Sequence, residues 1–195
     1  MSIITVKSYN EPPILEKEIL RYAGIREADF EMLNLIKSCI NEARGILSYK
    51  ICYCETGVSI NKAVCDFDYF SIESKSLAKN LEGCDAAVIF AATLGIGLDR
   101  LITKYSRISP SRALLLQAIG AERVEALCNA FCSDIAAAGK SIRNRFSVGY
   151  GDAPLDAQKD IFRVLDPTRY IGITLGDSML MSPTKSVTAF IGIEK

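Results

Sequence analysis

The stretch Cys84-Asp85-Ala86-Ala87-Val88-Ile89-Phe90-Ala91-Ala92-Thr93-Leu94 is an almost continuous apolar run near the middle of the chain. A run of this kind is typical of a β-strand that is buried on both of its faces. Gly95-Ile96-Gly97 follows and predicts a tight turn into a helix over Leu98–Ile108. We therefore expect a buried strand here that passes directly into a helix.

Upstream of this strand, the pattern predicts two helices and then a β-rich region. Apolar residues recur at helical spacing over Ile14–Tyr22, with Gly24 as the expected C-cap, and again over Glu27–Leu47. From Ser48 to Ile72, β-branched and aromatic residues predict short strands with a turn near Glu55-Thr56-Gly57.

Downstream, Pro110 opens the longest predicted helix, which runs to about Gly139 and is apolar nearly all round, so it should lie centrally. The remaining expected elements are a helix capped by Ser74 (Ser74–Leu81), a loop (Ser147–Pro154), a helix (Leu155–Leu165) and two short strands (Ile171–Leu175 and Val187–Ile193). Because helices and strands do not alternate strictly, the pattern favours an α+β fold over a doubly wound sheet.

The composition limits the class of protein. The 195 residues suit a single domain over residues 1–195, with residues 1–13 as an extended N-terminal arm. Lys plus Arg and Asp plus Glu each number 23, so no excess of positive charge favours nucleic-acid binding. Met1–Lys7 lacks the pattern of an export signal, and the low-polarity run Ala86–Gly97 is shorter than the roughly 20 residues of a membrane-spanning helix. We expect a cytoplasmic protein with no nucleic-acid or membrane partner.

The chain has seven cysteines and no histidine. Without histidine, neither a Ser-His-Asp nor a Cys-His catalytic arrangement can form. Cys52 with Cys54, and Cys128 with Cys132, are spaced so that each pair could in principle bind a soft metal. Their apolar neighbours favour a role as small buried hydrophobes instead. We predict no catalytic residue and no metal site.

Acidic side chains on the long predicted helix are the first candidates for ligand binding. Glu122 and Glu125 either belong to a solvated face, or one of them receives the ammonium group of an amino-acid-like ligand. The turn Gly95-Ile96-Gly97 is a weaker candidate for dinucleotide binding, because Arg100 occupies the position of the third glycine.

The second candidate is the run Arg145-Phe146-Ser147-Val148-Gly149-Tyr150-Gly151-Asp152-Ala153-Pro154. The Arg145 guanidinium can bind a carboxylate in a bidentate manner. Gly149 and Gly151 allow the backbone to approach a flat ligand closely, and Tyr150 can stack on it or shape the pocket. Asp152 or a neighbouring residue is expected to cap the helix that begins at Leu155.

This run resembles the R-x-x-P-G-Y … P segment of the reactivation domain of cobalamin-dependent methionine synthase. The stretch Gly172-Ile173-Thr174-Leu175-Gly176-Asp177-Ser178, with Met181-Ser182-Pro183 and Ser186-Val187, resembles the later G-x-x-L-T-E-S … M-x-P … S-V-S-G segment of that family. The resemblance implies a free-standing form of this domain, with a C-shaped α+β fold around a twisted, mainly antiparallel sheet. Val148 and Asp177 depart from the family pattern, since the family has proline and glutamate there.

The resemblance also implies a ligand and the residues that bind it. In that family the domain binds S-adenosylmethionine and docks on a cobalamin-binding domain. By resemblance, Arg145 would hold the carboxylate of the ligand and Glu125 its ammonium group, while Ser147, Gly149 and Tyr150 would frame the adenosyl part. Because the chain has no histidine to serve as an axial ligand, cobalamin would be carried by a partner chain.

Three functions remain open at this point. The leading one is a reactivation subunit, a component of methionine synthase (methyltransferase) activity, that presents S-adenosylmethionine for reductive methylation of cob(II)alamin. Its partners would be a separate methionine synthase or other corrinoid protein and a flavodoxin-type electron donor. The alternative is a docking or capping protein for a corrinoid-binding domain that has lost S-adenosylmethionine binding. The third is an unrelated cysteine-based metal or redox protein.

Overall fold

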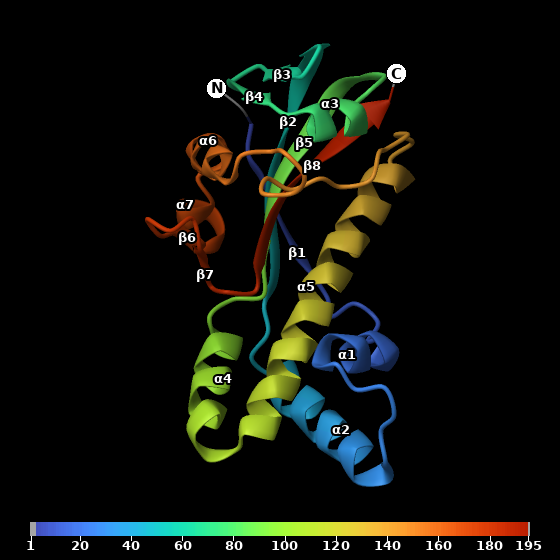
Figure 1. The fold of residues 1–195 in the computed structure, drawn as a ribbon, viewed down its shortest axis with the longest axis vertical. Coiled ribbons are helices and arrows are strands. Elements are labelled where there is room, and N and C mark those ends of the chain that lie inside the picture. The colour runs from blue at the N-terminus through green and yellow to red at the C-terminus, as the bar shows by residue number, and fades with distance from the viewer. Residues whose placement is uncertain (1–2, 195) are drawn as a thin grey trace.

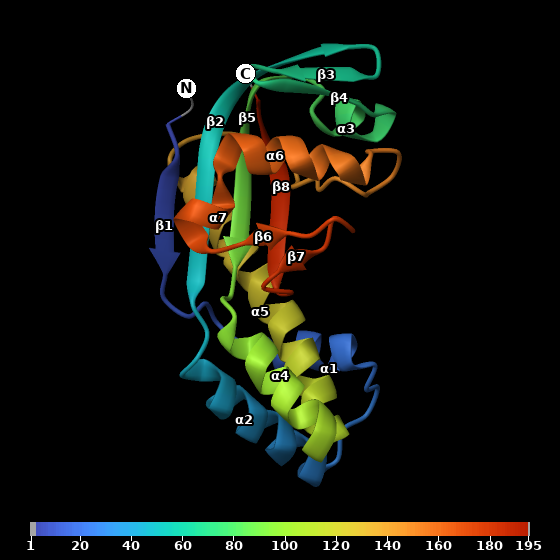
Figure 2. The same ribbon diagram turned by 90° about the vertical axis from the view of Figure 1, so that its left-hand side faces the viewer.

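The computed structural model describes residues 3–194. A twisted antiparallel sheet in the order β4-β3-β2-β5-β8, with β1 paired to β2, forms its centre (Figures 1 and 2). Its strands are β1 (Thr5–Tyr9), β2 (Tyr49–Asn61), β3 (Val64–Phe67), β4 (Phe70–Glu73), β5 (Cys84–Thr93) and β8 (Ser186–Glu194). The short strands β6 (Thr174–Leu175) and β7 (Met181–Ser182) pair only with each other.

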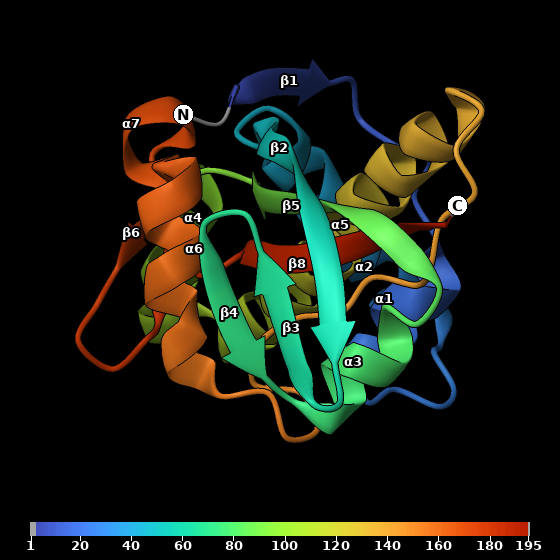
Figure 3. The same cartoon turned by 90° about the horizontal axis from the view of Figure 1, so that it is seen from above.

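Helices cover both faces of this sheet. They are α1 (Glu16–Ala23), α2 (Phe30–Arg44), α3 (Lys75–Asn80), α4 (Gly97–Ile108), α5 (Pro110–Ala137), the 3-10 turn η1 (Leu155–Ala157), α6 (Gln158–Leu165) and α7 (Pro167–Ile171). Figure 1 shows α5 on one side of the sheet and α6 with α7 on the other, while α1, α2 and α4 pack around α5. Seen from above, α6 lies alongside the β3–β4 hairpin (Figure 3).

Two apolar cores result, and β5 contributes to both. Val88, Phe90 and Ala92 face the core that contains α5, whereas Ile89 and Ala91 face the core that contains α6. The side chains of β5 alternate between these cores because successive residues of a strand point to opposite faces. The expected strand with two buried faces is therefore confirmed, and so is the α+β class with a mainly antiparallel sheet flanked by helices.

The long helix predicted from Pro110 is also confirmed, with Leu116, Leu127 and Phe131 fully or almost fully buried. The predicted helices upstream are present with shorter bounds. Gly24 caps α1 in the left-handed conformation, and the Asp29 side chain caps α2 by accepting a hydrogen bond from the Met32 amide.

The turn expected near Glu55-Thr56-Gly57 is wrong, because β2 continues straight through these residues. Residues 50–57 pair with β5, and residues 58–61 pair with β3. Gly57 is thus the point at which β2 changes partners. Its amide donates to the Asp68 carboxylate at 2.8 Å, which holds the β3–β4 turn against this point.

The strand expected over Ile171–Leu175 is reduced to β6, because α7 occupies the residues up to Ile171. Asp166 adopts a left-handed conformation, with φ of 42°, and its side chain accepts a hydrogen bond from the Arg169 amide. Pro167 then fills the first helical position, where a missing N–H costs little. An Asp-Pro pair is therefore the local signal for this short helix.

Within residues 3–194, none of the helices combines the length and apolar character needed to cross a membrane.

Candidate ligand-binding site at the edge of β8

The segment after α5 runs along the outer edge of β8 and carries the candidate arginine. Ile142 bridges Ile193 and Phe146 bridges Phe190, so residues 141–146 lie as an irregular strip beside the sheet. This strip brings Arg145 against α5. Arg145 and Glu125, which are 20 residues apart in the sequence, therefore come into direct contact.

The guanidinium of Arg145 is held by two side chains of α5. Its Nη2 lies 2.5 Å from Oε2 of Glu125, and its Nη1 donates to Oδ1 of Asn129 at 2.8 Å. The arginine side chain is 22% exposed and the glutamate side chain 42% exposed, so a ligand could reach both. The structure therefore brings the two predicted charges together as a direct ion pair.

A hollow of about 300 Å³ lies beside this pair, between α1 and α5. Glu125 and Asn129, the two residues bonded to Arg145, both line it, and Tyr22 lines it from α1. The guanidinium of Arg21 lies over the Tyr22 ring, 4.2 Å from its centroid. The hollow is thus lined by carboxylate, amide and aromatic groups next to the candidate ion pair.

Glu122, the other acidic candidate, has a structural role. Its side chain is 3% exposed and pairs with the 1% exposed side chain of Arg123. Arg123 also donates to the carbonyl oxygens of Pro12 and Pro13, at 2.6 and 2.7 Å. The pair therefore fastens the N-terminal segment to α5. The interpretation of Glu122 as part of a solvated face is wrong, and Glu125 is the acid that remains available.

The predicted loop begins where the chain crosses the edge of the sheet. Ser147 Oγ donates to the Thr188 carbonyl of β8 at 2.7 Å, and Val148 is buried in the core that contains α6. Gly149 has φ of +86° and its amide donates to the Ala153 carbonyl at 3.0 Å. Tyr150 is 69% exposed at the tip of this turn. Glu125 thus lies on α5, and the other four predicted site residues lie in the segment that passes from α5 around the edge of β8.

Asp152 fixes this loop to α3, which is a contact that the sequence did not reveal. Its carboxylate accepts hydrogen bonds from Ser74 Oγ at 2.6 Å and from the amides of Lys75 and Ser76 at 2.9 and 3.0 Å. These bonds hold the pKa of the Asp152 carboxyl well below its usual range. The expectation that Asp152 caps the helix at Leu155 is wrong, because the carboxylate caps α3 instead.

Gly151 shows why this contact needs glycine. It adopts a left-handed conformation, with φ of +59°, and a Cβ atom there would lie 2.5 Å from Ser76 Oγ. No non-glycine residue fits this position without displacing the start of α3.

The cysteines are buried, except for Cys132, which is half-buried. Burial raises the pKa of the Cys52 and Cys128 thiols to about 12, so both are protonated at neutral pH. Among the described residues, no three His, Cys, Asp or Glu side chains are grouped so that they could hold a metal ion.

The sheet with one long central helix, the small α6–α7 layer and the loop around β8 define a known class of domain. A solved structure described as the MetH reactivation domain bound to AdoHcy has the same fold, with a TM-score of 0.72. The match covers 97% of this chain and 78% of that chain at 12% sequence identity. At this identity the likeness shows the fold alone.

The family is shown by the sequence. The family model described as "Vitamin B12 dependent methionine synthase, activation domain" matches residues 59–195, and the chain belongs to this family. The resemblance inferred from the two C-terminal motifs is therefore confirmed. No curated protein shows significant sequence similarity to the chain.

Proposed function

We propose that this chain is a reactivation subunit that binds S-adenosylmethionine and supports reductive methylation of cob(II)alamin on a partner chain. The partner would be a separate cobalamin-dependent methionine synthase or another corrinoid protein, and a flavodoxin-type protein would donate the electron. All of these would act in the cytoplasm. Family membership supports the general role. The observation that carries the ligand assignment is the Glu125–Arg145 pair beside the loop that contains Gly149.

The ion pair suits a zwitterionic ligand because the ligand can replace each partner with a group of the same charge. The ammonium group of an amino acid would take the place of Arg145 at Glu125. The carboxylate would take the place of Glu125 at Arg145, where a guanidinium can donate two parallel hydrogen bonds. Asn129 would continue to hold the other edge of the guanidinium. The hollow of about 300 Å³ is at the lower limit for small-molecule sites, so it suits the amino-acid end of the ligand.

The loop would then frame the adenosyl part. Gly149 allows the left-handed turn of this loop, and Ser147 is fixed to β8 by its hydroxyl group. The exposed ring of Tyr150 is free to stack on a flat base. When bound, S-adenosylmethionine supplies the methyl group. The residues of this chain would contribute orientation and effective concentration, since the chain has no histidine to act as an acid or base.

Isothermal titration calorimetry with S-adenosylmethionine tests the ligand assignment. We expect saturable binding to the intact protein and roughly 10- to 100-fold weaker binding to the Arg145→Ala variant, because a hydrogen bond to a charged group is worth about 1.5–3 kcal/mol. Arg143→Ala is the matched control, since Arg143 lies in the same strip but pairs with Glu194. Equal affinity of both variants, or no binding with and without the corrinoid partner, would refute the assignment.

A second candidate is a docking protein for a corrinoid-binding domain that no longer binds the ligand. It is favoured by the fact that Glu125 and Arg145 already neutralise each other in this structure. This role requires that binding of the corrinoid protein is the same for the intact protein, Glu125→Ala and Arg145→Ala. A pull-down with the cobalamin-loaded partner, with and without S-adenosylmethionine, separates the two functions.

A further inference from the structure

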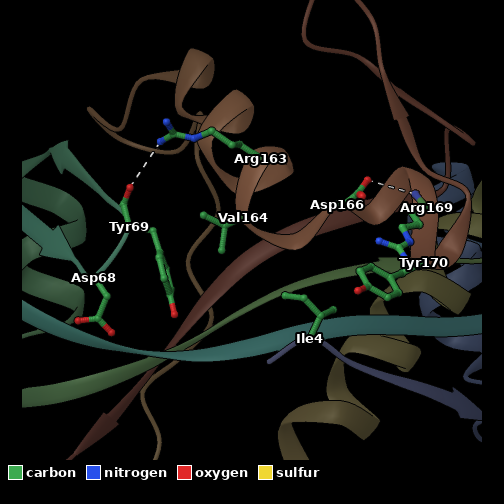
Figure 4. Close-up of a pocket in the computed structure, with 8 residues that line it drawn as sticks. All are labelled: Ile4, Asp68, Tyr69, Arg163, Val164, Asp166, Arg169 and Tyr170. Atoms are coloured by element: carbon green, nitrogen blue, oxygen red, sulfur yellow. Dashed lines mark hydrogen bonds between the residues drawn. The ribbon is translucent and has the colours of Figure 1, made fainter. Parts of the chain in front are cut away.

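A pocket of about 630 Å³ lies on the opposite side of the sheet from α5. It is open to solvent and lined by the start of the chain at Ile4, the β3–β4 turn at Asp68 and Tyr69, the end of α6, and α7 (Figure 4). Its volume falls within the usual range of small-molecule sites, which is about 300–1,000 Å³. Glu125 lies on α5, beyond the sheet, so this pocket is separate from the candidate site at β8.

The wall of the pocket combines aromatic and aliphatic surface. The rings of Tyr69 and Tyr170 stand apart from each other, and Ile4 and Val164 lie between them (Figure 4). Ile4 and Val164 also pack against the core that contains α6, which fixes their positions. Such a surface suits a flat ring, because both aromatic faces and aliphatic side chains bury it favourably.

One arginine of the pocket is not engaged in an ion pair with any of the residues that the structure describes. The guanidinium of Arg169 makes no hydrogen bond or ion pair within residues 3–194, and it lies 5.5 Å from the ring centroid of Tyr170. Arg163, the other arginine, is already bonded to Asp160 at 2.7 Å. Arg169 is therefore the group that remains available to bind an anion.

The two carboxylates of the pocket each accept hydrogen bonds from other groups of the protein. Asp68 accepts hydrogen bonds from the Gly57 amide at 2.8 Å and from Thr56 Oγ1 at 3.1 Å. Asp166 accepts one from the Arg169 amide at 3.3 Å, as the cap of α7. The Arg169 guanidinium bonds to neither of these carboxylates, so its N–H donors stay available to an anionic ligand.

We propose that this pocket binds a small aromatic anion, namely a flat ring that carries a carboxylate, sulfonate or phosphate group. The ring lies against Val164 and Ile4 between the two tyrosines, and the anionic group bonds to Arg169, whose planar donors match such groups. This site does not depend on the proposed function, because it shares no residue with the S-adenosylmethionine site.

Methyl NMR with 1-naphthoate as the probe tests the proposal. The protein carries labelled isoleucine and valine methyl groups, so Ile4 and Val164 report occupancy of the pocket directly. We expect their signals to shift in a saturable manner with 1-naphthoate. With the uncharged analogue 1-naphthylmethanol, and with the Arg169→Ala variant, binding should be about two- to fivefold weaker, since the ring contacts remain while the contact with an exposed charge is lost.

Arg107→Ala is the matched control, since Arg107 is exposed on α4 and also makes no ion pair among the described residues. It should bind 1-naphthoate like the intact protein, and circular dichroism should show that both variants fold. The proposal is overturned if the two methyl signals do not move, if the neutral analogue binds equally well, or if Arg169→Ala binds unchanged. Titration of Arg145→Ala with 1-naphthoate should give the unmodified affinity, which separates this site from the proposed function.

Discussion

At the scale of single residues, the Glu122–Arg123 pair shows how an ion pair can organise a chain terminus. Arg123 is the largest fully buried side chain among residues 3–194, and it reaches two proline carbonyls of the N-terminal segment. A buried charge is tolerated only when it is paired and hydrogen-bonded. Residues 12–15 therefore fold back onto α5 because they satisfy this pair.

Removal of one member of the pair should be much more costly than removal of an exposed pair. We expect Glu122→Ala to lower the free energy of unfolding by about 3–5 kcal/mol, because Arg123 would remain buried without a counter-ion. Glu18→Ala breaks the exposed Glu18–Arg21 pair and should cost less than about 1 kcal/mol. Urea denaturation followed by circular dichroism measures both. Similar losses for the two variants would contradict this account.

At the scale of elements, Asp152 joins the candidate ligand loop to α3. The sequence indicated an N-cap at this position, and the structure confirms a cap but on a helix 76 residues away. Local patterns predict the kind of hydrogen bond that a residue makes, whereas the partner depends on how the chain folds back. For the same reason, the local pattern did not predict the full length of β2. Gly57 suggested a turn, but the buried neighbours Cys54 and Val58 continue the strand into a new pairing.

This contact predicts a pH-dependent loosening of the loop. The pKa of Asp152 is lowered in the folded protein, so its contribution to stability is complete above the unfolded pKa of about 3.9 and is lost as the pH falls through the lower folded value. The amides of Lys75 and Ser76 should therefore lose protection against hydrogen exchange, measured relative to the intrinsic rate at the same pH, in strong acid and in the Asp152→Ala variant. Hydrogen exchange measured by NMR tests this.

Asp156→Ala is the control, because Asp156 is an exposed acid just after the loop. If the amides of α3 are protected equally in the Asp152→Ala and Asp156→Ala variants, Asp152 does not hold the loop.

At the scale of the whole molecule, the strand sequence predicts two cores. Phe90 on β5 packs against Phe131 of α5, with ring centroids 5.0 Å apart, while Phe190 on β8 packs against Phe67 at 5.0 Å on the other face. We expect Phe90→Ala and Phe190→Ala each to cost about 3–5 kcal/mol, whereas Phe30→Ala, at a 77% exposed position, should be close to neutral. Thermal and urea unfolding measure these differences. If either the Phe90→Ala or the Phe190→Ala variant loses little free energy of unfolding, the corresponding core does not contribute to stability as we propose.

The buried strand β5 and the long helix α5 could be predicted from the sequence, because their apolar patterns fit few other secondary structures. The motifs around Gly149 and Met181 identified the family. Residue spacing could not reveal that Arg145 pairs directly with Glu125, since that contact depends on the strip of residues 141–146 beside β8. The pocket around Arg169 was also missed, because the sequence pattern predicted no helix over residues 167–170.

The strip beside β8 has a consequence for solubility. Four backbone hydrogen bonds, which involve Ser141, Arg143 and Phe146, satisfy the outer row of N–H and C=O groups of β8. An uncovered strand edge is a template for pairing with other chains. Because the same strip carries Arg145, any change that detaches the ligand-binding segment would also unmask this edge. Self-association into aggregates, rather than simple loss of affinity, would then be the first visible defect.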